Sequence, residues 1–170
     1  MPNWCANTLK MSGDELEIKR AMKMLKDDKG QLTFNKAVPM PLPLVDAVSP
    51  SKEPNQELIK RYGADNWYDW RYKHWGVKWD ASESEFIEDN MVVFQTPWNA
   101  PIKFLERFSQ EFPSLTFGLQ FADENEGYYP LGEISVRNGV TEDVGLGVEE
   151  GSMKAEEMAA TIWQGVWYEQ

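Results

Sequence analysis

The chain contains one cysteine, Cys5, and one histidine, His74, the residue types most often used as nucleophile and general base. A catalytic pair needs the base in contact with the nucleophile, and a zinc site needs several such ligands. Cys5 shares one face of a predicted strand with Leu9 and has no adjacent basic residue, so we expect a buried, poorly reactive thiol. His74 lies among aromatic residues and is expected to be a packing or surface histidine rather than a catalytic base. We therefore predict no catalytic residue and no metal ligand.

Two further motifs resemble ligand-binding loops but fail on spacing. Asp123, Asn125 and Gly127 match the start of a calcium loop, but Gly127 and Ile134 occupy the fifth and twelfth positions, where ligands are required. A hairpin turn is predicted instead. The glycines of residues 145–151 are wrongly spaced for a dinucleotide loop, and two glutamates there would repel phosphates. No cofactor is expected.

The acidic side chains are concentrated in the second half of the chain. The net charge is −11, with 13 basic and 11 acidic residues in 1–80 (net +2) and 4 basic and 17 acidic in 81–170 (net −13). Such a field repels phosphates and attracts a basic protein surface, so nucleic acid is an improbable partner. A surface that only keeps the protein soluble is the competing interpretation.

Carboxylates that could act as an acid–base pair include Asp80 with Glu83 or Glu126, but their spacing selects no pair. A small carbohydrate- or nucleotide-directed enzyme therefore stays an alternative without named catalytic residues. The stronger hypothesis is a surface that contacts another protein. Its candidate residues are Trp67, Trp70, Trp75, Asp80 and Glu126.

The tryptophans among these candidates belong to a dense aromatic segment, Trp67 to Trp79. Most of its indoles should be buried, because each removes a large area from water, but at least one of the first two should reach solvent. Alternation starting at Trp75 predicts a strand in which Trp75 and Trp79 share one face and are at least half buried.

Periodicity and turn residues predict the remaining elements. Strands are expected at 3–11, 32–38, 75–85, 91–96, 115–122 and 128–136, and helices at 14–29, 56–62, 101–112 and 152–167. The first helix should begin with a capping box at Ser12, and Ser152 should cap the last helix. The buried face of that last helix should consist of Ala155, Met158, Ala159, Ile162, Trp163 and Val166. The proline-rich residues 39–54 should form an ordered loop, and 139–151 at most one short edge strand.

This order indicates an α+β, ferredoxin-like antiparallel sheet with helices 14–29 and 101–112 on one face. We expect one domain, residues 1–170, with an aromatic-rich insertion at about 39–74 and a C-terminal helix at about 152–167. No apolar run is long enough to span a membrane, and the first residues lack the pattern of a secretory signal.

Several segments together resemble the YubB-like family of bacteriophage and plasmid proteins, with its Api-type ferredoxin-like domain. They are residues 1–7, 75–81, 94–101, 112–117 and the turn at 126–127. The resemblance implies the fold and a mobile-element accessory protein in the cytoplasm of a bacterial cell. It provides no biochemical activity that can be carried over to this chain. Residues after about Gly139 lie outside it.

We therefore expect a non-enzymatic accessory protein that binds another protein or a second copy of itself. The single cysteine agrees with a reducing compartment. An acidic mimic of DNA, which would occupy a host nucleic-acid-binding protein, is the alternative in the same setting. That function requires carboxylates spaced like phosphates along one face.

Overall fold

A computed structural model describes residues 1–145 and 147–165 of the chain. In these residues an antiparallel sheet of six strands has the order β2-β3-β1-β4-β5-β6. The strands are β1 (Trp4–Ser12), β2 (Ser82–Glu88), β3 (Met91–Pro97), β4 (Thr116–Asp123), β5 (Leu131–Arg137) and β6 (Val140–Asp143). The predicted antiparallel sheet and its late edge strand are confirmed.

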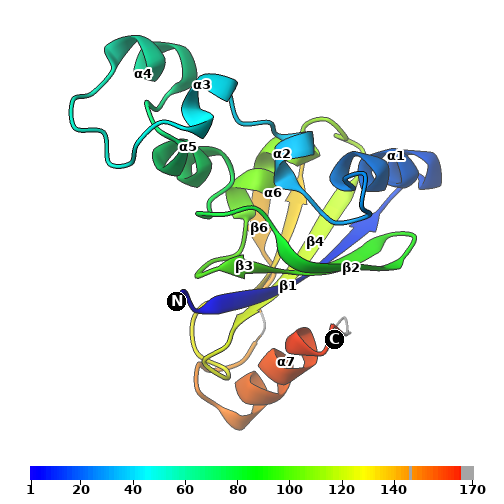
Figure 1. The fold of residues 1–170 in the computed structure, drawn as a ribbon. Coiled ribbons are helices and arrows are strands. Elements are labelled where there is room, and N and C mark those ends of the chain that lie inside the picture. The colour runs from blue at the N-terminus through cyan, green and yellow to red at the C-terminus, as the bar shows by residue number, and fades with distance from the viewer. Residues whose placement is uncertain (146, 166–170) are drawn as a thin grey trace.

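The helices form layers on both faces of the sheet (Figure 1). Helices α1, α2 and α6 cover one face, α7 lies against the other, and α3, α4 and α5 form a lobe beyond one end. Their bounds are α1 (Glu15–Leu25), α2 (Phe34–Ala37), α3 (Leu42–Val45), α4 (Gln56–Tyr62), α5 (Trp67–His74), α6 (Ile102–Ser109) and α7 (Met153–Trp163). Since α1 and α6 correspond to the helices predicted at 14–29 and 101–112, their shared face is confirmed.

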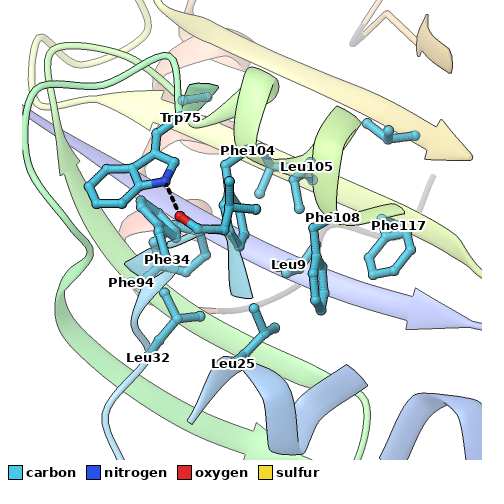
Figure 2. Close-up of a cluster of buried hydrophobic side chains, with 14 of the residues drawn as sticks. Leu9, Leu25, Leu32, Phe34, Trp75, Phe94, Phe104, Leu105, Phe108 and Phe117 are labelled. Carbon is cyan, nitrogen blue, oxygen red and sulfur yellow. Dashed lines mark hydrogen bonds between the residues drawn. The ribbon is translucent and has the colours of Figure 1, made fainter. Parts of the chain in front are cut away.

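The main hydrophobic core fills the space between the sheet and the α1–α6 layer, and large aromatic rings dominate it (Figure 2). Phe34 contacts the rings of Trp75, Phe94 and Phe104 at centroid distances of 5.8, 5.9 and 4.3 Å. Alternate residues of β4 point into this core, which explains the strict apolar periodicity of residues 115–121. Burial of these rings is the largest stabilising contribution to this face.

The opposite face of the sheet is covered more thinly. A small cluster of buried side chains joins α7 to the central strands: Ala6, Ala122, Ala159 and Ile162. The predicted buried stripe of this helix is confirmed at Ala155, Met158, Ala159 and Ile162, whereas Trp163 is only partly buried. Val166, which was also predicted to be buried, lies outside the described residues.

Helix boundaries follow side-chain caps. The predicted capping box at Ser12 is wrong, because Asp14 is the N-cap of α1 and accepts hydrogen bonds from the amides of Leu16 and Glu17. The helix ends at Leu25, four residues early, since the Asp27 carboxylate binds backbone amides of the following turn. Helix α4 has the predicted bounds and ends at Gly63, whose φ of +77° suits glycine.

The strand predicted at 32–38 is wrong. Leu32 makes one isolated bridge to Lys26, and the chain then enters α2. Strand β2 pairs with β3 instead and completes the pattern β1–α1–β2–β3–α6–β4 of a ferredoxin-like fold. All residues between α1 and β2 are therefore an insertion, which is longer than the predicted 39–74.

The first part of the aromatic segment is helical, and no element was predicted there. Trp67–His74 forms α5, and the chain from Trp75 to residue 81 is irregular before β2 begins at Ser82. The predicted strand from Trp75 is therefore wrong in its first seven residues. The proline-rich loop contains one short helix, α3, in which Leu44 is fully buried while Leu42 is exposed.

Candidate binding surface

Two of the predicted partner-contacting tryptophans lie in the core. Trp70 is 4% exposed and Trp75 is 1% exposed, so their assignment to a binding surface is wrong. The Trp75 indole nitrogen donates a hydrogen bond to the Val38 carbonyl at 3.0 Å, which ties the insertion to the core (Figure 2). The ring of Trp70 also packs against that of Trp75 with centroids 5.7 Å apart, a contact that alternation in a strand did not predict.

Of the two tryptophans in α5, Trp67 is partly exposed to solvent, whereas Trp70 is buried. Its ring lies 5.1 Å from the Arg71 guanidinium carbon, which also lies 5.3 Å from the Trp75 ring. Burial lowers the pKa of Arg71, and the charge of Asp80 acts in the opposite direction. These contacts give Trp67 a structural role within the insertion.

Asp80 acts as a connector between the insertion and the sheet. Its carboxylate accepts hydrogen bonds from the Phe34 amide at 2.6 Å and the Thr33 hydroxyl at 2.7 Å. The side chain of Thr33, the α2 N-cap, accepts no hydrogen bond from the helix amides, so Asp80 supplies the cap from a distant part of the chain. Glu83, its suggested catalytic partner, lies in β2 at a register shift with a φ of +46°. Asp80 is therefore better explained by folding than by catalysis.

Cys5 and His74 are also placed by packing. Cys5 is fully buried as predicted, and burial with the nearby charge of Asp123 raises the pKa of its thiol. His74 stacks on Trp70 with centroids 4.4 Å apart, and burial lowers its pKa. A lowered pKa keeps this imidazole neutral near pH 7.

Glu126 lies on the turn between β4 and β5, where the hairpin turn predicted for residues 123–127 is confirmed. The Asp123 carboxylate accepts a hydrogen bond from the Asn125 amide at 2.9 Å, and Glu126 adopts a φ of +43°. Gly127 has a φ of +88°, and a Cβ there would lie 2.7 Å from the Glu156 amide nitrogen. Only glycine permits this close approach of the turn to α7.

Around this contact lies a surface hollow of about 600 Å³, which we call the glutamate hollow. Its floor consists of small and aromatic apolar side chains of α7, and exposed carboxylates line its sides. The lining residues are Glu124, Glu126, Glu156, Glu157, Ala159, Ala160 and Trp163.

Hydrogen bonds hold α7 and the turn in this arrangement. The Ser152 hydroxyl caps α7 by accepting from the Ala155 amide, as predicted, and the Gly151 amide donates to the Gly127 carbonyl at 2.9 Å. The Trp163 indole nitrogen donates to the Asp123 carbonyl at 3.1 Å. Hydrogen bonds near both ends of α7 thus join this helix to the β4–β5 turn, and the helix and the turn together line the glutamate hollow.

The hollow has an uncompensated negative charge in the described part of the chain. No lysine or arginine lines it, and the two ion pairs found among residues 1–145 and 147–165 lie on α1 and α6. Like charges gathered at one concave surface raise the local negative potential and attract cationic groups. Sequence reasoning found Glu126 but missed its neighbours, because only folding brings α7 against the β4–β5 turn.

Metal-binding clusters and membrane-spanning helices are absent from the residues that the structure describes. No three histidine, cysteine or carboxylate side chains converge closely enough to hold a metal ion. No helix there combines the length and the apolar composition that crossing a bilayer requires.

Comparison with known proteins places this architecture in a family. A protein-family model described as the ferredoxin-like domain in Api92-like protein matches residues 74–165, which is more than half of the chain. The match continues past Gly139 and includes α7, which the sequence resemblance had left out. A crystal structure of a protein api92 from Yersinia pseudotuberculosis is similar with a TM-score of 0.47 and 10% identity, over 88% of this chain and 100% of that one. No curated protein matches.

Proposed function

The chain belongs to the family of the ferredoxin-like domain in Api92-like protein, and we propose that it is a non-enzymatic module that binds a basic segment of another protein. The observation that carries the proposal is the glutamate hollow. It combines four exposed carboxylates with an apolar floor on one rigid helix and one tight turn. A lysine or arginine side chain has this same division, with an apolar stem and a charged end.

Each part of the hollow has a function in this proposal. The stem of a basic side chain would pack on Ala160 and Trp163, where it also meets the face of an indole. Its charged end would lie among the carboxylates of Glu124, Glu126 and Glu156, in a surface with no competing lysine or arginine. The negative field would speed association and make the affinity sensitive to salt.

The alternatives fit this geometry less well. A mimic of DNA needs carboxylates along a line, whereas the four glutamates gather around one hollow with an apolar floor. An enzyme that uses paired carboxylates needs them at a defined separation on either side of a substrate bond. Asp80 does not contribute to such a pair with Glu126, because its carboxylate is hydrogen-bonded to residues at the start of α2.

The proposal includes the setting that the sequence resemblance implies, an accessory protein of a phage or plasmid that acts in the cytoplasm of a bacterial host. Sequencing the genes that flank this one in its source genome tests this part. Neighbouring phage or conjugation genes would support it, and a chromosomal housekeeping operon would contradict it.

The binding experiment uses a fluorescein-labelled hexalysine peptide, with a labelled hexaglutamate peptide as the negative probe. We expect anisotropy titrations to show saturable binding of hexalysine that weakens about tenfold in Glu126→Gln/Glu156→Gln, since each lost charge contact is of the order of 0.5–1 kcal/mol. The affinity should also fall between 50 and 200 mM salt.

A matched variant separates the hollow from the overall charge of the chain. Glu53→Gln/Glu111→Gln removes two exposed glutamates of other regions and changes the net charge by the same amount. We expect it to bind hexalysine like the wild type. Equal weakening in both double variants would show that the peptide responds to net charge and would contradict the proposed site.

A further inference from the structure

Trp98, in the loop between β3 and α6, adopts a backbone conformation that large side chains rarely occupy. Its φ is +61°, and the Asn99 amide donates to the Pro97 carbonyl at 2.8 Å, so that Trp98 is the centre of a three-residue turn. A positive φ is unfavourable for a bulky aromatic residue, whereas glycine and asparagine tolerate it. Tryptophan is therefore poorly suited to the backbone conformation of this position.

Buried polar groups hold this turn in place. The Trp98 amide donates to the Asn3 carbonyl at 2.9 Å, and the Thr96 hydroxyl donates to the Asn99 carbonyl at 2.6 Å. The Asn7 side-chain amide donates in turn to the Thr96 hydroxyl at 2.9 Å, and both Asn7 and Thr96 are almost inaccessible to solvent. Strain that the surrounding structure enforces is typical of functional positions.

The turn places the Trp98 indole in a surface cluster that we call the tryptophan row: Trp4, Trp79 and Trp98. Trp79 is the middle member, with its ring centroid 6.3 Å from each of the other two. Trp98 is 38% exposed, and Trp4 and Trp79 are partly exposed. The Lys78 ammonium lies 4.7 Å from the Trp79 centroid and 5.5 Å from that of Trp98. Since a cation already contacts both rings, the remaining surface of Trp98 suits an apolar side chain.

The tryptophan row adjoins the turn that forms one wall of the glutamate hollow. The Glu124 amide donates to the Trp4 carbonyl at 3.1 Å, so the first residue of β1 is fastened to a residue that lines the hollow. Figure 1 shows the N-terminus beside the loop that follows β4, above the start of α7. The backbone that carries Trp4 of the tryptophan row is therefore next to the turn that carries Glu124 and Glu126 of the glutamate hollow.

We propose that Trp98 and the tryptophan row bind a bulky apolar side chain of the same basic segment whose cations enter the glutamate hollow. This inference rests on the proposed function and adds a second requirement to the partner's sequence. The partner must carry a bulky apolar residue at some distance along its chain from its cluster of lysines or arginines. The part of the partner that lies next to Lys78 must carry no positive charge. Aromatic anchors of this kind often contribute most of the affinity at a protein interface.

The test compares fluorescein-labelled peptides of six lysines that are followed by two leucines or two serines, each with spacers of zero, two or four glycines. For at least one spacer, the wild type should bind the leucine peptide about tenfold more tightly than its serine counterpart. Trp98→Asn should abolish this preference while its affinity for the serine peptide stays unchanged. Tyr68→Ala, which removes an exposed ring on α5, should keep the preference.

Thermal melts distinguish binding from packing. Because asparagine tolerates the backbone of residue 98, Trp98→Asn should melt no lower than the wild type. A fall of several degrees would identify Trp98 as a packing residue and overturn the inference, as would a leucine preference that is absent for all spacers or survives in Trp98→Asn. If the proposed function is wrong and the glutamate hollow does not bind cations, Glu126→Gln/Glu156→Gln will bind the serine peptide as tightly as the wild type does. This result is distinct from a loss of the leucine preference.

Discussion

The two faces of the sheet are stabilised in different ways. Under α1 and α6 the core consists of interlocked rings, among them Phe34, Phe104 and Phe108, that are almost inaccessible to solvent. Under α7 the buried cluster consists mainly of alanines, and the helix leaves Trp163 partly exposed beside a hollow. The aromatic face holds the fold together, whereas the α7 face carries the charged and concave surface. The region with the smaller buried cluster is thus the one that carries the proposed binding site.

Removing the largest ring of the aromatic face should have the largest effect on stability. We expect Trp75→Ala to lower the free energy of unfolding by about 3–5 kcal/mol, because it leaves a cavity and an unpaired Val38 carbonyl. Urea unfolding measures the difference. Trp79→Ala, at a partly exposed indole, should cost less than half as much. Equal losses of unfolding free energy in Trp75→Ala and Trp79→Ala would show that solvent exposure does not predict how much each indole of the aromatic segment stabilises the fold.

On the α7 face, stability should depend on the volume of the buried side chains rather than on aromatic rings. Ala159→Leu inserts a large side chain into the alanine contact with the sheet and should cost about 1–3 kcal/mol. Ala160→Leu, on the neighbouring exposed position, should change stability by only a few tenths of a kcal/mol. Thermal melts of both variants test the expectation. A tolerated leucine at 159 would mean that α7 can move away from the sheet.

The connection between the insertion and the sheet should depend on Asp80. Asp80→Ala removes the acceptor for the Phe34 amide and the Thr33 hydroxyl, and we expect a loss of about 1–2 kcal/mol in urea unfolding. Asp46→Ala, at an exposed residue after α3, is the matched control and should leave the urea midpoint unchanged. A stable Asp80→Ala protein would return this carboxylate to the list of candidate binding groups.

The smallest effect concerns Cys5, whose thiol faces the aromatic core. Its folded pKa lies above the unfolded value, so the unfolded chain loses its proton first as the pH rises and the native state loses relative stability. Between pH 7 and pH 9 the wild type should lose about 0.8 kcal/mol more than Cys5→Ala, since the unfolded thiol titrates near pH 8.5.

Thiol labelling gives an independent check on Cys5. Reaction of the native protein at pH 8 should be slow and should accelerate when urea unfolds the chain, because the thiol is fully buried. Fast labelling of the native state would show that β1 opens locally and that the aromatic face is less rigid than its packing indicates.

Local patterns were sufficient for much of this fold. The alternation in β4, the bounds of α4, the turn at residues 123–127 and the Ser152 cap each depend on neighbouring residues, and all are confirmed. The antiparallel order with α1 and α6 on one face follows from these elements and their short connections. Glu126 was found because the second half of the chain is acidic and a turn exposes its side chains.

Tertiary contacts decided the rest. The sequence of residues 32–38 alternates like a strand, but Asp80 caps α2 from a position far along the chain. The burial of Trp70 and Trp75, the meeting of α7 with the β4–β5 turn and the positive φ of Trp98 also depend on distant partners. Local sequence determines which conformations are favourable, whereas the binding surface arises where segments far apart in the chain pack together.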